Sequence, residues 1–327
     1  MNEPFRFRLH RRILRLAAAE AIAFGLWAAL APGTFFDLFR MEPPRYPSAW
    51  RCLGMVVGLY GLGYAYAASR LERARPWVAI GLMGKVIGPV GWILAVRSGE
   101  WSVRTVSLIL FNDVVWWVPF SLILLEGTRL GARIRRAAAP ACFVLNTAGA
   151  FAMLFVLRHG LESAADPSVR AAYIADHPWL WRGSWAIWVA AAVSLLGFYA
   201  SWGSRRADAR RGLAAFGVAA AGLAFDLAGQ GLLMGWFPED LARLDRACAL
   251  LSGAAANGLY TVAGTMLTLG TGDLRGARRI WTWVVWGSGY GLAAAALVGS
   301  VAGMAAATAA VMISFCPWVW FVGRRLA

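Results

Sequence analysis

The sequence predicts an all-α membrane protein with ten transmembrane helices and with both the N-terminus and the C-terminus in the cytoplasm. Of its 327 residues, 60% are hydrophobic and 15% are charged, whereas a soluble protein carries about 25% charged residues. Apolar runs of about 20 residues, the length that crosses a bilayer, recur along the chain. Arginines gather in every second connection between these runs.

The predicted spans follow one another with short connections. The first begins like a secretory signal, but Glu20 interrupts its apolar run and Pro32 follows it, so we expect an uncleaved helix. The last two are separated only by a glycine-containing turn, and one long irregular segment is the alternative. The spans cover residues 13–31, 50–69, 77–96, 105–125, 139–157, 183–202, 213–236, 247–269, 280–300 and 302–322.

The distribution of charge predicts the orientation. With a cytoplasmic N-terminus, the inside segments hold 21 arginines and five acidic residues, and the outside segments hold 10 arginines and nine acidic residues. Cytoplasmic loops favour positive residues. This placement explains the net charge of +15 without nucleic acid and predicts contact with anionic lipid headgroups on the cytoplasmic side.

Tryptophans at the predicted span ends are expected to lie at the two membrane surfaces, where an amphipathic ring is well placed. They are Trp50, Trp77, Trp101, Trp179, Trp181, Trp236, Trp281 and Trp318.

An arginine-rich connection at residues 127–138 predicts two units. The first is a four-helix unit over residues 1–130, and the second is a six-helix unit over residues 131–327. A division into five and five spans would suit a transporter with inverted repeats, and it is the alternative.

Charged side chains in the middle of the third and fourth spans define a first polar centre. Lys85, the only lysine, lies near the midpoint of its span, and Asp113 lies beside Asn112 at a similar depth in the next span. A charge at the bilayer centre costs about 2.5–3.5 kcal/mol unless it is paired. We therefore expect Lys85 to pair with Asp113, with Glu20 as a second partner. The pair is a structural bridge, a site for a substrate or proton, or a covalent lysine site.

Glycines surround this centre. Small residues let helices approach closely, so we expect the second and third spans to pack tightly and the fourth to form one helix with Asp113, Trp116 and Trp117 on one face. The glycines are Gly54, Gly58 and Gly61 in the second span and Gly81, Gly84 and Gly88 in the third.

Polar side chains of the seventh and eighth spans define a second centre. Asp226 and Gln230 lie one helical turn apart, and Asn257 and Tyr260 share a face of the next span. Asn146 adds an amide from the fifth span. These groups either form hydrogen bonds between helices, worth about 0.6 kcal/mol each, or surround a cavity for a polar headgroup or proton.

Motifs of several enzyme classes are absent from the sequence. It has no H-x-x-x-H or H-E-x-x-H motif, no Walker A loop and no G-x-S-x-G sequence. We therefore expect no metal, no cofactor and no ATP-driven cycle.

Two stretches, residues 43–125 and 145–323, resemble uncharacterised bacterial polytopic membrane proteins. The resemblance implies a multi-pass protein of the bacterial inner (plasma) membrane that joins two modules, and it implies no activity. It rests on Gly84-Lys85, Asn112-Asp113-Val114-Val115-Trp116-Trp117, His177-Pro178-Trp179-Leu180-Trp181-Arg182, Ala256-Asn257-Gly258-Leu259-Tyr260-Thr261 and Phe315-Cys316-Pro317-Trp318.

Buried charge without a catalytic motif favours a carrier or binding protein for a small or lipophilic molecule, of unknown oligomeric state. An intramembrane enzyme acting on a lipid or isoprenoid, with Asp226 and Tyr260 in acid–base roles, is the alternative. A structural or assembly subunit is the third possibility. A carrier predicts an aqueous path to Lys85, a lipid enzyme predicts a cavity that opens sideways and ends at Asp226, and a structural subunit predicts neither.

Overall fold

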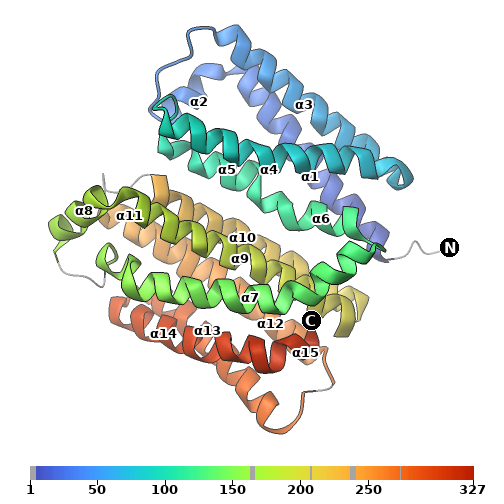
Figure 1. Ribbon diagram of the computed structural model, residues 1–327, viewed down its shortest axis with the longest axis vertical. Coiled ribbons are helices and arrows are strands. Elements are labelled where there is room, and N and C mark those ends of the chain that lie inside the picture. Colours follow the sequence, from blue (N-terminus) through green and yellow to red (C-terminus); the bar gives the residue numbers. More distant parts are fainter. Residues whose placement is uncertain (1–4, 163–165, 207, 236–240, 273) are drawn as a thin grey trace. The chain divides into compact units, whose positions relative to one another are not determined.

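The computed structural model describes the chain except residues 1–4, 163–165, 207, 236–240 and 273. Helices make up 89% of the structure, and the described residues contain no strand, so the all-α prediction is confirmed. The chain divides into two compact units, Met1–Thr128 and Arg129–Ala327 (Figure 1).

The first unit is built on two long helices, α1 and α3, which pack along each other, and α4 and α6 cover them. Its main core consists of small and apolar side chains from these helices, including Leu14, Tyr64 and Phe120. The helices are α1 (Phe5–Leu30), α2 (Pro32–Leu38), α3 (Pro47–Ser69), α4 (Ala74–Arg97), α5 (Val106–Asn112) and α6 (Trp117–Leu125), with 3-10 turns η1 (Leu71–Arg73), η2 (Val103–Thr105) and η3 (Val114–Trp116).

The second unit contains six long helical rods and a short helix, α8. The rods contact one another in the order α7, α9, α10, α12, α13 and α14, and α14 returns to α7, so they form a closed ring. The elements are α7 (Arg129–Phe155), η4 (Leu157–His159), α8 (Pro167–Asp176), α9 (Pro178–Arg206), α10 (Ala209–Gly235), α11 (Leu241–Cys248), η5 (Ala249–Ala256), α12 (Asn257–Leu269), α13 (Gly276–Val298), α14 (Val301–Trp318), η6 (Val319–Gly323) and α15 (Arg324–Leu326).

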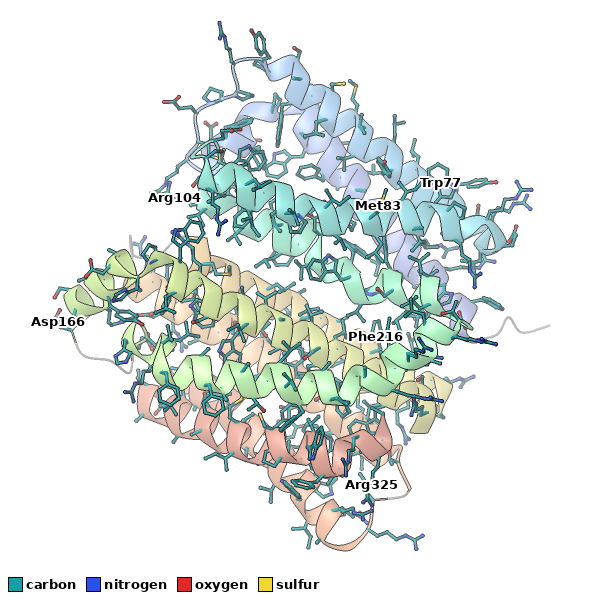
Figure 2. All side chains as sticks on the ribbon, viewed as in Figure 1. Trp77, Met83, Arg104, Asp166, Phe216 and Arg325 are labelled. Carbon is teal, nitrogen blue, oxygen red and sulfur yellow. The ribbon has the colours of Figure 1, made fainter. Side chains whose placement is uncertain are left out.

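Eight helices among the described residues are long and apolar enough to cross a membrane by length and composition. Their outer surfaces carry large apolar side chains; on α4, for example, Trp77 and Met83 are 37% and 57% exposed (Figure 2). Such apolar surface is typical of a protein whose surroundings are lipid. The chain therefore has the features of a multi-pass membrane protein, while the count of ten spans and the positions of the termini remain predictions.

The fourth predicted span is not one helix. It consists of α5, the 3-10 turn η3 and α6, and the interruption falls at Asp113. Irregular backbone inside a membrane requires that its polar groups be bonded within the protein. The Lys85 ammonium meets this requirement by donating to the oxygen of Asn112.

Gly54, Gly58 and Gly61 of the second predicted span face the first span, whereas Gly63 lies against Trp77 of the third. A Cβ atom at Gly25 of α1 would overlap the backbone of Gly54 and Gly58 of α3, and one at Gly61 would overlap Ile22 of α1. The second and third spans do contact each other, at Gly63 and Trp77 and at Tyr64 and Gly81, but the three regularly spaced glycines serve the contact with the first span. On α4, Gly81 lies against Tyr64 and Phe120, whereas a Cβ atom at Gly84 would meet open space.

Three tryptophans of the predicted belt are buried inside the protein. Trp179 is 54% exposed, but Trp50, Trp181 and Trp318 are 8%, 1% and 0% exposed and belong to the core. Each of these three indoles packs on another aromatic ring inside its own unit. Trp236 lies outside the described residues.

Aromatic rings of α9, α13 and α14 form a cluster in the second unit, near the arginine-rich connections. Three indole N–H groups in it donate to threonine hydroxyls at 2.8–3.0 Å, and each hydroxyl donates to the carbonyl four residues earlier in the chain. The cluster is therefore fixed by hydrogen bonds as well as packing. The pairs are Trp202–Thr271, Trp286–Thr268 and Trp318–Thr282.

Candidate functional site

Lys85 is buried in the first unit and its ammonium group bonds to backbone. The side chain is 7% exposed. Its Nζ donates a hydrogen bond to the main-chain oxygen of Asn112 and lies 5.9 Å from the centre of the Trp116 ring. A cation over an indole face is stabilised electrostatically. The amine thus has two partners, one a carbonyl and the other an aromatic ring.

The interruption of the fourth span explains why that carbonyl is available. In a continuous helix the Asn112 oxygen would accept from the N–H of Trp116, but this N–H donates to the oxygen of Asp113 at 3.1 Å. The Lys85 ammonium takes its place. A second hydrogen bond joins the same helices in the opposite direction. Pro89 of α4 has no N–H, so the oxygen of Lys85 lacks its usual donor within the helix. Trp117 Nε1 donates to that oxygen at 2.9 Å.

The two acidic residues of the first predicted centre lie near Lys85 without pairing with it. Their charges are close enough to act on that of Lys85, but among the described residues neither Asp113 nor Glu20 forms an ion pair with it. Asp113 accepts from Asn112 Nδ2 at 3.0 Å, and Glu20 Oε2 is buried without a hydrogen-bond partner. The direct Lys85–Asp113 bridge expected from the sequence is replaced by the contact with the Asn112 carbonyl.

The ring of the second unit encloses a cavity of about 690 Å³. Its wall is mainly apolar and comes from all six rods, and Asp226, Gln230, Asn257 and Tyr260 line it together with Asn146. Ligand cavities of this kind measure roughly 300–1,000 Å³ and combine apolar walls with a few polar groups. The residues of the second predicted centre thus share one cavity.

The polar groups of this cavity are held by specific contacts. Tyr260 Oη donates to Asp226 Oδ2 at 3.4 Å, whereas Asn257 Nδ2 donates to the oxygen of Gly289 on α13 at 2.6 Å. Asn257 and Tyr260 directly follow the π-helical segment η5, which also lines the cavity. Segments of this type occur frequently at functional sites. Asp226 lies nine residues before the end of α10, a depth of about 14 Å at 1.5 Å per residue.

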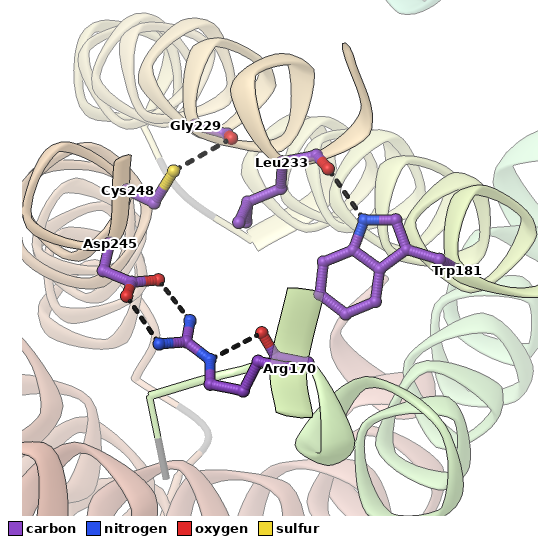
Figure 3. A network of polar contacts seen from close by, with 7 residues as sticks. Arg170, Trp181, Gly229, Leu233, Asp245 and Cys248 are labelled. Carbon is purple, nitrogen blue, oxygen red and sulfur yellow. Dashed lines mark hydrogen bonds and ion pairs between the residues drawn. The ribbon is translucent and has the colours of Figure 1, made fainter. Parts of the chain in front are cut away.

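A polar network (Figure 3) lies beside the end of the cavity that Glu162 and Asp245 line, which we call the cavity mouth. Arg170 of α8 holds Asp245 of α11 through two bonds of 2.9 and 2.7 Å, and its Nε donates to the oxygen of Gly160 at 3.1 Å. Trp181 Nε1 donates to the oxygen of Leu233 at 2.7 Å. Cys248 Sγ of α11 donates to the oxygen of Gly229 on α10 at 3.4 Å, so these contacts together link α8 to α11, α11 to α10 and α10 to α9.

The opposite side of the cavity, between α7 and α14, is loosely packed. From Val301 to Ser314, α14 has no buried residue, whereas the residues that follow it include buried Phe315 and Trp318. Leu154 of α7 and Ile313 of α14 are 51% and 75% exposed, and both line the cavity. Exposed apolar side chains of both helices thus border the cavity along this boundary, which we call the α7–α14 seam.

The charges along the cavity wall are mostly negative. Among the described lining residues there are three carboxylates, Glu162, Asp226 and Asp245, and one guanidinium, Arg158. Asp245 is neutralised by Arg170. At the mouth, partial burial and then the charge of Asp245 raise the pKa of Glu162 above its ordinary value.

Sequence reasoning missed the network at the mouth. Arg170 and Asp245 are 75 positions apart in segments that connect predicted spans, where charged residues are ordinarily solvated. The only sequence signal was their position next to apolar spans. Likewise, the proline four residues after Lys85 was the one indication that the Lys85 oxygen needs a side-chain donor.

Comparisons with known proteins returned no match to a family model, to a curated protein or to a solved structure. The resemblance to bacterial membrane proteins therefore remains an expectation.

Proposed function

We propose that the protein binds a lipophilic molecule in the cavity of the second unit and exchanges it with the bilayer, as a membrane carrier or binding protein. The observation that carries this proposal is the cavity itself, about 690 Å³ in volume, apolar along most of its wall and polar around Asp226 and Gln230. An amphipathic ligand would match this pattern, with its chain on the apolar wall and its polar group near the carboxylate.

The α7–α14 seam supports exchange with the bilayer. Its exposed residues are apolar, including Leu154 and Ile313, so lipid chains would face it directly. Near the arginine-rich end the seam is closed by the rings of Phe143 and Trp320, with centroids 5.1 Å apart. A ligand would therefore enter through the half of the seam near the start of α14, which belongs to the outer leaflet if the predicted orientation holds.

The first predicted centre has a different proposed role. Lys85 bonds to a carbonyl that the interrupted helix leaves free, which is a structural task. Substrate or proton handling by Lys85, Asp113, Asn112 and Glu20 remains a prediction without added support. A location in the bacterial inner membrane and binding of anionic headgroups by the arginines remain proposals from the sequence.

An intramembrane enzyme is the second candidate, favoured by the contact of the Tyr260 hydroxyl with the Asp226 carboxylate at 3.4 Å. A phenol and a carboxylate in contact can exchange a proton with a bound substrate. The sideways cavity at Asp226 suits this candidate as well as the carrier. The two differ in the fate of the ligand, which leaves a carrier unchanged and leaves an enzyme as a product.

Photolabelling of the full-length protein tests the proposal. The protein in lipid nanodiscs is exposed to a long-chain lipid that carries a diazirine, and labelled peptides are identified by mass spectrometry. We expect labelling on α9, α10 and α14, and an about tenfold loss in Ala309→Trp, because the indole would narrow the seam at a cavity-lining position.

Ala306→Trp is the matched control, since Ala306 is exposed on the same helix and is not among the cavity-lining residues. It should label like the parent protein. Labelling confined to the outer surface, or equal in both variants, would count against a ligand in the cavity. Conversion of the lipid to a product, lost in Tyr260→Phe, would favour the enzyme.

A further inference from the structure

Asp226 carries the described cavity-lining carboxylate that lies away from the mouth. The residue is 8% exposed, and the surface that it retains faces the cavity that it lines. Among the described residues, no cationic side chain forms an ion pair with it. The neighbours that act on its charge are Ser252, Gln230 and Tyr260, and all three are neutral. An acidic side chain at such a depth ordinarily has a partner or faces a pathway, so a ligand is a candidate counter-ion.

The polar groups around Asp226 leave hydrogen-bond acceptors for a ligand. Tyr260 Oη donates to Asp226 Oδ2 at 3.4 Å, and Ser252 Oγ donates to the main-chain oxygen of Asp226 at 3.5 Å. Asn257 is partly exposed and lines the cavity, and its amide nitrogen donates to the oxygen of Gly289 at 2.6 Å. The side-chain oxygen of Asn257 therefore remains as an acceptor, and a carboxylate has room for about four hydrogen bonds. A ligand group that donates fits this end of the cavity better than one that only accepts.

The charge along the rest of the wall also favours a cation. Glu162 adds a second carboxylate at the mouth. Arg158, the one described lining cation, is exposed and its Nε donates to His159, so water screens its charge more than that of Asp226. In surroundings of low polarity, the attraction between a cation and Asp226 acts over several ångströms. A cationic group therefore needs to approach the carboxylate without displacing its existing donors.

Aromatic rings of the wall are compatible with the same charge. Trp188 and Tyr260 line the cavity and keep part of their surface accessible. A cation within about 6 Å of a ring centre is attracted by the negative face of the ring. A carboxylate together with aromatic rings is a set that attracts alkylammonium groups and repels anions.

We infer that the ligand is a lipophilic amine, bound in its ammonium form, with the positive group beside Asp226 and the chain extending along the apolar wall toward the α7–α14 seam. This inference rests on the proposed function and deepens it, because it names the headgroup that the polar end selects. The ammonium group donates to the carboxylate and to the Asn257 side-chain oxygen, and it is the counter-ion of Asp226.

The test compares photoreactive sixteen-carbon probes with the same diazirine position and different ends: an amine, an alcohol, a carboxylate and a hydrocarbon. The full-length protein is placed in nanodiscs of zwitterionic lipid, so that the bilayer itself does not concentrate cations. Affinities are measured at pH 7 by competition against the amine probe. The amine should bind about tenfold more tightly than each of the other three, which is a difference of about 1.4 kcal/mol.

Two variants examine the assigned carboxylate. Asp226→Asn removes the charge and keeps the shape, so it should weaken binding of the amine about tenfold and change binding of the alcohol less than about twofold. Asp226→Glu keeps the charge and should keep the preference for the amine. Asp208→Asn is the control, because it removes an exposed carboxylate next to the start of the same helix, outside the described cavity lining. It should change neither probe.

Equal or tighter binding of the alcohol or the carboxylate probe would overturn the inference while leaving a lipid in the cavity. A preference for the amine that survives Asp226→Asn would overturn it as well. If Asp226→Asn does not fold, the ranking of the probes on the parent protein and on Asp226→Glu decides. Failure of all four probes to label the cavity would instead contradict the proposed function, so the two failures are distinguishable.

Discussion

Replacing Arg170 by methionine will lower the free energy of unfolding by about 3–5 kcal/mol, the usual result of leaving one member of a buried ion pair alone. Arg170 and Asp245 side chains are each 5% exposed and share two hydrogen bonds. The substitution leaves the Asp245 carboxylate buried without its cation. The measurement is chemical unfolding of the full-length protein in mixed micelles, followed by circular dichroism.

The double variant Arg170→Met with Asp245→Leu is the informative control. Removing both charges and keeping the apolar volume should restore the free energy of unfolding to within about 1 kcal/mol of the parent value. The attraction within a buried ion pair mainly offsets the cost of burying its two charges, so losing both together changes little. If the single variant is as stable as the parent, the network does not hold the cavity mouth. If the double variant is as unstable as the single one, the loss does not come from an isolated charge.

Replacing Lys85 by methionine will lower the free energy of unfolding by about 1.5–3 kcal/mol, because the carbonyl of Asn112 loses a charged donor.

Replacing Trp117 by phenylalanine will lower the free energy of unfolding by about 1–2 kcal/mol, because the oxygen of Lys85 loses the indole N–H. Both effects are measured by the same unfolding experiment. Neither depends on a bound substrate.

Pro89→Ala separates this explanation from simple loss of packing. The alanine supplies the N–H that the oxygen of Lys85 lacks, so in this background Trp117→Phe should cost less than about 0.5 kcal/mol, the scale of an ordinary exposed substitution. An equal cost of Trp117→Phe with and without the proline would show that the indole matters through its volume alone.

The fold class could be predicted from composition and from the recurring apolar runs, because both are properties of the whole chain and depend on no single residue. An all-helical membrane protein needs only lengths of about 20 apolar residues and a bias in arginine placement. The count of spans was harder to fix because the polar α11 and the π-helical η5 precede α12 in one rod. Helix partners also escaped prediction, since the glycines at 54, 58 and 61 suit any neighbour and sequence does not say which one.

The two polar centres show what sequence can predict about a site. Counting residues from the span ends predicted that Asp226, Gln230, Asn257 and Tyr260 lie in one region. This works because each residue of a regular helix advances a fixed distance along the helix axis. It did not foresee the interruption at Asp113, where a local hydrogen-bond exchange makes a carbonyl, rather than a carboxylate, the partner of Lys85. It also gave no sign of the seam, which depends on how weakly α14 packs on α7.

A density map of the full-length protein, purified into nanodiscs with the lipids of its own membrane, tests the central claim most directly. We predict an elongated non-protein density inside the ring, passing from the α7–α14 seam to Asp226 and Gln230. A map at side-chain resolution in which these helices close on one another, with the cavity filled by protein side chains, would contradict the claim.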